Sequence, residues 1–300
     1  MTITTPDAPA PSPAARATPA PALVAERPPG DRRARFDAMR AVVAKDLTAV
    51  KRSKAVVLPM LFVPVLLLIV LPLIIGLIAS NSQAVEVNDF LTRLPAGVAD
   101  PITSLPREEQ MIVLVNGYLL APLFLIVPLM ISAVLAADAF AGEKERKTLE
   151  SLLHLPLRDN DLFLAKLASA FIPALAVSWI GFVCFATVAN TVAWPVMHRL
   201  FLPTQLWMVM ILWVAPAVAA LGLGVMVRVS ARARTAQEAN QLGGSVILPL
   251  IFLAMGQATG LLLVDLAVAL GIGAVLWLLA IWLIARGAKR FTRDSLAAKV

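Results

Sequence analysis

Residues that could carry out chemistry are concentrated in one segment, Asp138–Lys166, which is the most highly charged stretch of the chain. Two acidic residues in it are followed four positions later by a basic one, which allows ion pairing along a helix: Glu143 with Lys147, and Glu150 with His154. An apolar ridge lies beside these charges and consists of Leu149, Leu152 and Leu153. Pro156 ends the predicted helix. Such a short amphipathic helix suits docking on another protein, and a solvated hairpin explains it equally well.

The sequence contains no residue pattern that would support a metal site or ATP binding. The chain has one cysteine, Cys184, two histidines, His154 and His198, and no H-E-x-x-H or C-x-x-C pattern. Residues 141–148 superficially resemble a P-loop, but positions 141 and 146 are Ala and Arg, where glycines must let backbone amides surround a phosphate. We therefore expect no metal site, no cofactor and no catalytic residues in this chain, which is predicted not to be an enzyme.

The elements that position this segment are membrane spans. Hydrophobic residues make up 59% of the chain, charged residues 15%, and the mean hydropathy is +0.83, so the chain cannot cover a water-facing surface. Six stretches contain no Asp, Glu, Lys or Arg, and each is about long enough to cross a ~30 Å hydrocarbon core as a helix. They are Ala55–Val85, Gln110–Ala137, Leu167–His198, Leu200–Val227, Ala239–Val264 and Leu266–Ala285. The predicted fold class is an all-α integral membrane protein with six transmembrane helices.

The distribution of Lys and Arg predicts the orientation. If the N-terminus is cytoplasmic, the cytoplasmic segments from Arg40 onward carry eighteen of them, whereas the outer loops carry three, Arg93, Arg107 and Arg199. This asymmetry predicts that both termini are cytoplasmic. It also explains the formal charge of +7 without nucleic acid.

Four regions follow from these patterns. Residues 1–30 are predicted to be a disordered Pro/Ala-rich tail, and residues 286–300 a basic cytoplasmic tail. Residues 31–54 are predicted to form an amphipathic helix, with an apolar face of Phe36, Met39, Val43, Leu47 and Val50. We favour an interfacial position for this helix over packing on a cytosolic partner. The six-span domain occupies 55–285 and contains a cytoplasmic loop at 138–161.

Polar groups inside the spans are scarce. Asp265, near the outer end of the sixth span, is the one ionisable candidate, and we favour a solvated residue at the loop edge over an intramembrane site. A proton- or ion-coupled carrier is therefore disfavoured. Seven prolines lie within the spans, where they either act as hinges or are simply tolerated: Pro64, Pro72, Pro122, Pro128, Pro173, Pro216 and Pro249.

The charged segment resembles the loop signature of type-2 ATP-binding-cassette (ABC) exporter permeases, which runs roughly E-x-E-x-G-T-L-E-x-L-L, then a Pro and a Lys. The matching residues here are Glu143, Glu145, Thr148, Leu149, Glu150, Leu152, Leu153, Pro156 and Lys166. Lys147 stands where the family often has Gly. The amphipathic helix before the first span, the six spans, the cytoplasmic termini and the Gly256–Gly260 break between the last two spans extend the resemblance over about residues 31–290.

The resemblance implies a permease subunit of an ATP-driven exporter, located in the bacterial inner membrane. ATP and Mg²⁺ would bind a separate ATP-binding-cassette subunit, and a second permease would complete a homo- or heterodimer. The segment Glu143–His154 would be the helix that couples the permease to the ATPase. The resemblance places the dimer interface on spans 1 and 5, where Gly243, Gly244 and Ser245 allow close approach, although packing within one chain explains these residues equally well.

Two other classes of protein remain open. One is an ion- or proton-coupled secondary transporter, which would need an intramembrane ionisable group beyond Asp265. The other is a membrane anchor for an ATPase, without transport of its own. The apolar spans weakly favour a hydrophobic or amphiphilic cargo, and nothing in the sequence identifies it further.

Overall fold

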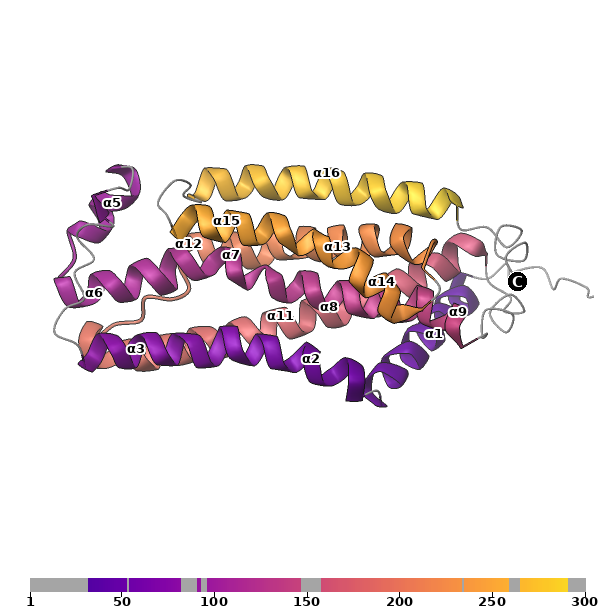
Figure 1. Cartoon of the computed structure of the whole chain (residues 1–300), viewed down its shortest axis with the longest axis horizontal. Helices are drawn as coiled ribbons and strands as arrows, with labels where there is room; N and C mark the ends of the chain where they lie inside the picture. The colour runs from indigo at the N-terminus through magenta and orange to yellow at the C-terminus, as the bar shows by residue number, and fades with distance from the viewer. Residues whose placement is uncertain are drawn as a thin grey trace, which may run out of the picture.

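The computed structural model describes residues 32–52, 54–81, 91–92, 96–146, 158–233, 235–258 and 265–290, and its long helices run side by side in one bundle (Figure 1). Within these ranges, six helical rods are long and apolar enough to cross a membrane, which confirms the predicted all-α, six-span fold. Spans 1 to 6 are Met60–Ile78, Arg107–Gly142, Asp159–Met197, Gln205–Ser230, Ala236–Gly256 and Leu266–Lys289.

Most spans are built from consecutive helical segments. Span 1 comprises α2 (Lys54–Val65), the π-helical turn η1 (Leu66–Val70) and α3 (Leu71–Asn81). Span 2 comprises α6 (Arg107–Ile112), η2 (Val113–Leu119, π-helical), α7 (Leu120–Phe124), α8 (Ile126–Ala137) and η3 (Asp138–Gly142, π-helical), and α9 (Glu143–Glu145) continues it. Span 4 comprises α12 (Gln205–Val209), η4 (Met210–Val214, π-helical) and α13 (Ala215–Ser230). Span 5 comprises α14 (Ala236–Gly243), the 3₁₀ turn η5 (Gly244–Ile247) and α15 (Leu248–Ala258). The remaining elements are α1 (Arg32–Arg52), α5 (Ala96–Thr103), α11 (Asp159–Met197, span 3) and α16 (Leu266–Arg290, span 6).

Prolines account for most of these irregular turns. Proline has no amide hydrogen and its ring clashes with the carbonyl four residues earlier, so the helix must adjust at that carbonyl. In four cases that carbonyl lies inside a π-helical or 3₁₀ turn: Pro72 follows η1, Pro122 follows η2, Pro216 follows η4 and Pro249 follows η5. Pro173 and Pro195 instead lie within the continuous helix α11.

Spans 2 and 4 form the centre of the bundle. In the most apolar window of each, 67% of the residues are buried, against 22–28% in the other four spans. Trp207 of span 4 is fully buried, its ring centroid lies 4.7 Å from that of Phe185, and its indole Nε1 donates to the carbonyl of Asn116, 3.0 Å away in η2. Gly222 lets spans 2 and 4 approach closely, because a Cβ there would lie 2.6 Å from the Ser132 hydroxyl.

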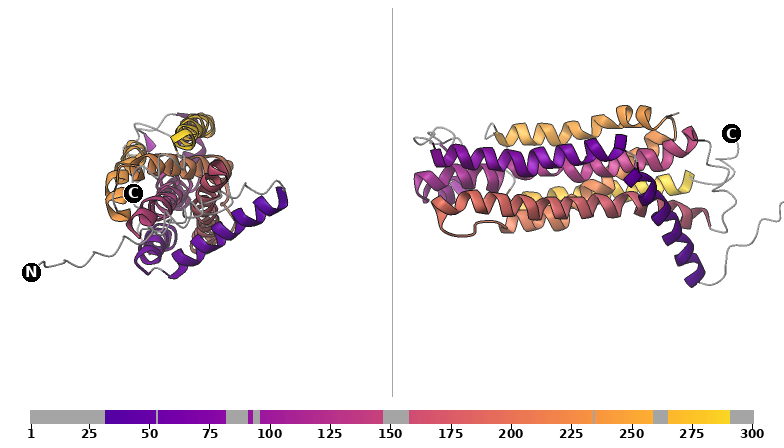
Figure 2. Two further views of the ribbon diagram at one scale, coloured as in Figure 1. Left: turned by 90° about the vertical axis from the view of Figure 1, so that its right-hand side faces the viewer. Right: turned by 90° about the horizontal axis from the view of Figure 1, so that it is seen from below.

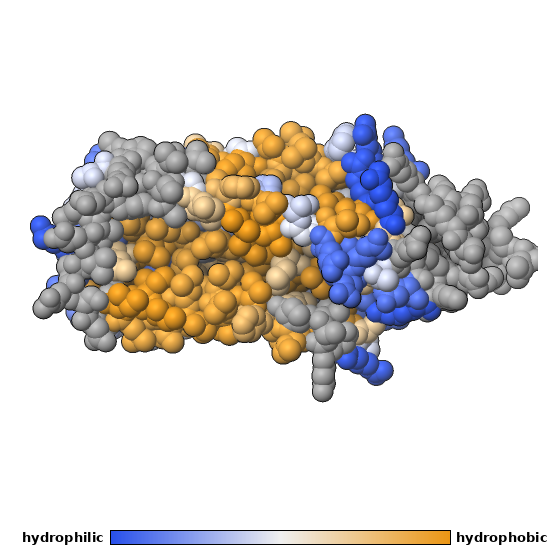
Figure 3. Space-filling model, viewed as in Figure 1, coloured by the Kyte–Doolittle hydropathy of each residue, from blue (hydrophilic) through white to orange (hydrophobic). Residues whose placement is uncertain are grey.

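The two ends of the bundle differ in chemistry. Spans 1, 3 and 5 begin, and spans 2, 4 and 6 end, at what we call the basic end, and its described cations include Lys45, Arg146, Lys166, Arg228 and Arg286. Figure 3 shows a broad hydrophobic band over the side of the bundle and a concentration of hydrophilic residues near this end. The opposite end carries α5, α6 and the start of α16 (Figure 1).

Helix α1 lies at the basic end and diverges from the bundle axis (Figure 2). It packs on α11 through a small apolar cluster of Val42, Leu162 and Ala165. Phe36, the first residue of the predicted apolar face, is 60% exposed. The predicted tail at 1–30, residues 291–300 of the predicted tail at 286–300, and the end of the Gly256–Gly260 break lie outside the described residues. Residues 286–290 of that predicted tail form the last residues of α16.

Candidate functional site

Glu143 and Lys166 form a buried ion pair at the basic end. The Lys166 Nζ lies 2.5 Å from Glu143 Oε2, and the two residues are 2% and 6% exposed. Lys166 also donates to the carbonyl oxygen of Ala139 at 3.0 Å, and its ammonium lies 6.0 Å from the centroid of the Phe140 ring. The lysine is therefore held by a carboxylate, a carbonyl and an aromatic face.

The Glu143–Lys166 ion pair joins the two ends of the segment that connects span 2 to span 3. Glu143 follows the π-helical turn η3 where span 2 ends, and Lys166 lies about two turns into α11, where span 3 begins. Spans 2 and 3 are antiparallel neighbours, so these two side chains meet even though they are far apart in sequence. The ion pair thus closes the base of the segment that links spans 2 and 3.

Helix α1 joins the same cluster through side chains on one of its turns. Lys45 Nζ donates to the second oxygen of Glu143, Oε1, at 3.2 Å, and lies 3.6 Å from Asp46 Oδ1. The Ser169 hydroxyl donates to Asp46 Oδ2 at 3.2 Å. We call Lys45, Asp46, Glu143, Lys166 and Ser169 the polar clamp, because they connect α1, the end of span 2 and the start of span 3.

Removing either charge of the central pair would leave the other buried without its partner. Breaking a buried ion pair in this way costs about 3–5 kcal/mol, whereas replacing both charges with apolar groups is often nearly neutral. A buried pair is therefore weak support for stability alone. What its geometry provides is one defined arrangement of three helices.

A second set of contacts ties the end of span 2 to span 5. Glu145 Oε2 accepts a hydrogen bond from the backbone nitrogen of Ala236, the first residue of α14, at 3.1 Å. Arg146 Nη2 lies 2.5 Å from Asp138 Oδ1, and this pair crosses over Gly142, where a Cβ would lie 2.9 Å from the Asp138 oxygen. Movement at the end of span 2 would therefore also reach span 5.

A small cavity borders the polar clamp. It has a volume of about 180 Å³, and Lys45, Asp46, Asp138, Glu143 and Ser169 are among the residues that line it. Water occupies about 30 Å³ per molecule in the liquid, so the space suits a few waters that solvate the charges of α1. Within the described ranges, no three His, Cys, Asp or Glu side chains are grouped to hold a metal ion.

The structure describes only part of the predicted coupling segment. Glu143 and Lys166 are brought together, and Glu145 lies beside α14. The other predicted coupling residues lie outside the described residues: Thr148, Leu149, Glu150, Leu152, Leu153, His154 and Pro156. Sequence reasoning missed Lys45, Asp46 and Ser169. Their only signal was an acidic residue, Asp46, beside the apolar face of a predominantly basic helix.

Asp265 has a local role at the start of α16. It is exposed, and its Oδ1 accepts a hydrogen bond from the backbone nitrogen of Val268 at 2.8 Å. This is the geometry of a helix N-cap. The contact accounts for the carboxylate without an intramembrane role.

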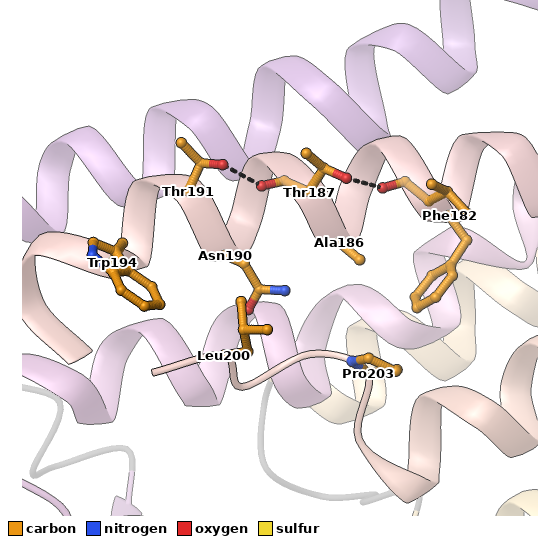
Figure 4. Close-up of a pocket in the computed structure, with 9 residues that line it drawn as sticks. Phe182, Ala186, Thr187, Asn190, Thr191, Trp194, Leu200 and Pro203 are labelled. Carbon is orange, nitrogen blue, oxygen red and sulfur yellow. Dashed lines mark hydrogen bonds between the residues drawn. The ribbon is translucent and has the colours of Figure 1, made fainter. Parts of the chain in front are cut away.

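A shallow groove of about 630 Å³ lies near the opposite end, between α11 and the connection that follows it (Figure 4). Its polar side chains already have backbone partners. Thr187 and Thr191 each donate to the carbonyl four residues earlier in α11, and Asn190 bonds to the backbone of Phe201 and Leu202. With these donors occupied, the groove presents a mainly apolar surface.

The comparison with known protein families matches most of the chain. Residues 40–281 match the family described as ABC-2 family transporter protein. The chain belongs to the ABC-2 transporter family. No curated protein matches it significantly.

Membership identifies the six-span bundle as an ABC transporter permease, a multi-pass membrane component of a transporter. The match includes Lys45, Glu143 and Lys166, so the central contacts of the polar clamp lie inside the permease domain. One residue considered for contact between permeases has a partner within the chain: a Cβ at Gly243 would collide with the sulfur of Met226. Gly244 has open space around its Cα, and Ser245 is exposed.

Proposed function

We propose that this ABC-2 permease is the membrane subunit of an ATP-driven exporter, and that the segment between spans 2 and 3 receives the movement of a separate ATP-binding-cassette subunit. ATP and Mg²⁺ would bind that subunit, and this chain would bind no cofactor of its own. The buried Glu143–Lys166 pair is the observation that supports the coupling role, since it fixes both ends of that segment to each other.

The coupling depends on how firmly the segment is attached at its base. A contiguous set of contacts transmits movement when it links elements that have two arrangements. A displacement of residues 147–157 by the ATPase would pull on span 2 and span 3 together through Glu143 and Lys166. Lys45 would carry the same displacement to α1, and Glu145 would carry it to α14.

Orientation, assembly and location complete the proposal. The basic end would face the cytoplasm, with both termini on that side and α1 in the membrane interface, in a bacterial inner membrane. Two permeases, identical or different, would pair, and spans 1 and 5 would meet in the dimer. Both expose large apolar side chains that could form such a contact: Leu58, Leu61 and Phe62 on α2, and Ile251, Phe252 and Met255 on α15. The cargo would pass between the permeases, and their apolar surfaces favour a hydrophobic or amphiphilic molecule.

Recruitment of an ATPase tests this proposal. The full chain would be co-expressed with the ATP-binding-cassette subunit encoded beside it and purified in detergent through a tag on the permease. We expect a stable complex, and we expect Leu152→Asp with Leu153→Asp to lose the ATPase while the permease still inserts in the membrane, because two carboxylates would occupy the apolar ridge of the docking helix.

A matched control is available at the other end of the bundle. Leu200 is 72% exposed, so Leu200→Asp adds a charge without disturbing the predicted docking helix and should leave recruitment unchanged. Undiminished recruitment by the Leu152→Asp, Leu153→Asp variant would contradict the assignment of this segment. Failure of the wild-type chain to bind the neighbouring ATPase would contradict the proposed function.

A further inference from the structure

Two arginines flank one exposed tryptophan where spans 4 and 6 end. The Cζ of Arg286 lies 4.1 Å, and that of Arg228 lies 5.4 Å, from the centroid of the Trp282 ring. Arg228 comes from the last turn of α13, while Trp282 and Arg286 are one turn apart on α16. Stacking on the ring holds both guanidinium groups near the same place, at two different helix ends.

These arginines are not neutralised by acidic residues of the described structure. The ion pairs of the basic end use other cations instead: Arg35, Lys45, Arg146 and Lys166. In the parts of the chain that the structure describes, no carboxylate oxygen lies within 4.0 Å of Arg228 or Arg286. Lys289, three residues beyond Arg286, is exposed and adds a third positive charge on that side of α16.

An apolar face of α16 leads directly to this cationic group. Val275, Leu278 and Ile281 are 56%, 70% and 59% exposed, and Trp282 itself is 46% exposed. In a membrane span such a face contacts acyl chains, and tryptophan is enriched where hydrocarbon gives way to headgroups. In a membrane the guanidinium groups would therefore lie at the depth of lipid phosphates, at the end of a surface that fits acyl chains.

We propose that Arg228, Trp282 and Arg286 bind the phosphate headgroup of an anionic phospholipid, with its acyl chains along the exposed face of α16. A guanidinium matches a phosphate with two parallel N–H donors, which an ammonium cannot do. The bound lipid would bridge the ends of spans 4 and 6. This proposal depends on the membrane placement of the bundle and not on the coupling role of the polar clamp.

Fluorescence quenching by brominated lipids tests the site on the full chain. Protein in detergent would be titrated with brominated phosphatidylglycerol and, in parallel, with brominated phosphatidylcholine. Subtracting the signal of the Trp282→Phe variant isolates the contribution of Trp282. Inorganic phosphate, added as a competitor, distinguishes a lipid headgroup from a free anion.

We expect Trp282 to be quenched at lower concentrations of phosphatidylglycerol than of phosphatidylcholine. Arg228→Gln with Arg286→Gln should weaken the apparent affinity for phosphatidylglycerol by roughly twenty-five-fold, at about five-fold per arginine. Arg228→Lys with Arg286→Lys should also weaken it several-fold, because lysine keeps the charge and loses the paired donors. A role limited to stabilising the helix ends would be preserved by lysine.

A charge-matched control distinguishes lipid binding at a defined site from general electrostatic attraction of anionic lipid to the basic end. Lys51→Gln with Arg52→Gln removes the same charge from exposed positions on α1 at the same end of the bundle, and it should leave the quenching of Trp282 unchanged. Three results would each overturn the proposal. They are equal quenching by the two lipids, a loss of affinity for phosphatidylglycerol in this control equal to that of the double Arg→Gln variant, and displacement of the lipid by inorganic phosphate.

Discussion

The Glu143–Lys166 pair predicts a large coupling energy between two residues that are far apart in sequence. Glu143→Gln leaves the Lys166 ammonium buried with only a carbonyl and an aromatic ring. This variant should therefore lower the free energy of unfolding by an amount near the upper end of about 3–5 kcal/mol. Lys166→Met leaves Glu143 with Lys45, which is partly exposed, so its cost should lie near the lower end. The double variant removes both charges and should cost less than the two single variants together, by about 2–3 kcal/mol.

A second ion pair of the same length provides the control. Arg199 Nη2 and Glu109 Oε2 also lie 2.5 Å apart, but at the opposite end of the bundle, and the arginine side chain is 54% exposed. Exposed pairs typically contribute about 0.2–1 kcal/mol. The cycle of Glu109→Gln and Arg199→Met should therefore give a coupling energy several times smaller than the cycle at the polar clamp.

Both cycles can be measured on the purified permease by unfolding it with SDS in mixed micelles and following its circular dichroism. The free energy of unfolding of the wild type, the two single variants and the double variant gives each coupling energy. Additivity within about 0.5 kcal/mol at Glu143 and Lys166 would refute the argument that they form a buried, mutually dependent pair. A larger cost for Lys166→Met than for Glu143→Gln would refute the role given to Lys45.

Two further predictions concern the contacts between spans 2 and 4. Gly222→Ala should lower the free energy of unfolding by about 1–3 kcal/mol, because the new methyl group would collide with span 2. Gly271→Ala should raise the free energy of unfolding slightly in the same SDS titration, because the space around Gly271 is open. Trp207→Phe should lower the free energy of unfolding by about 1–3 kcal/mol, because the buried carbonyl of Asn116 loses the indole donor. Trp213→Phe should lower it less, because Trp213 is exposed. Equal losses for these two variants would contradict the account of the core.

The bundle was predictable from the sequence because membrane spans are identified by one simple property. Each span needs about twenty apolar residues without charge, and six such stretches were visible. The exact helix ends were less predictable. Leu200 was assigned to span 4, whereas the helix begins at Gln205, because apolar residues also line the connection that follows α11.

The polar clamp was only partly predictable. Glu143 and Lys166 were selected by resemblance to a family signature, but nothing in their spacing indicates that they touch each other. Their contact depends on the antiparallel packing of spans 2 and 3 and on the π-helical turn η3, which sets the direction of Glu143. The role of Asp46 was not predictable because a carboxylate on a predominantly basic helix usually lies on a solvated surface, and α1 carries two, Asp37 and Asp46.

Permease-dependent ATP hydrolysis tests the central claim most directly. The complex with its ATPase would be reconstituted in nanodiscs, and its hydrolysis rate compared with that of the ATPase alone. We predict that the double variant Glu143→Gln, Lys166→Met still binds the ATPase but loses most of the permease-dependent change in rate, while the Glu109→Gln, Arg199→Met control keeps it. Wild-type coupling in the polar-clamp variant, with the complex intact, would contradict the claim that these residues transmit movement from the ATPase to the spans.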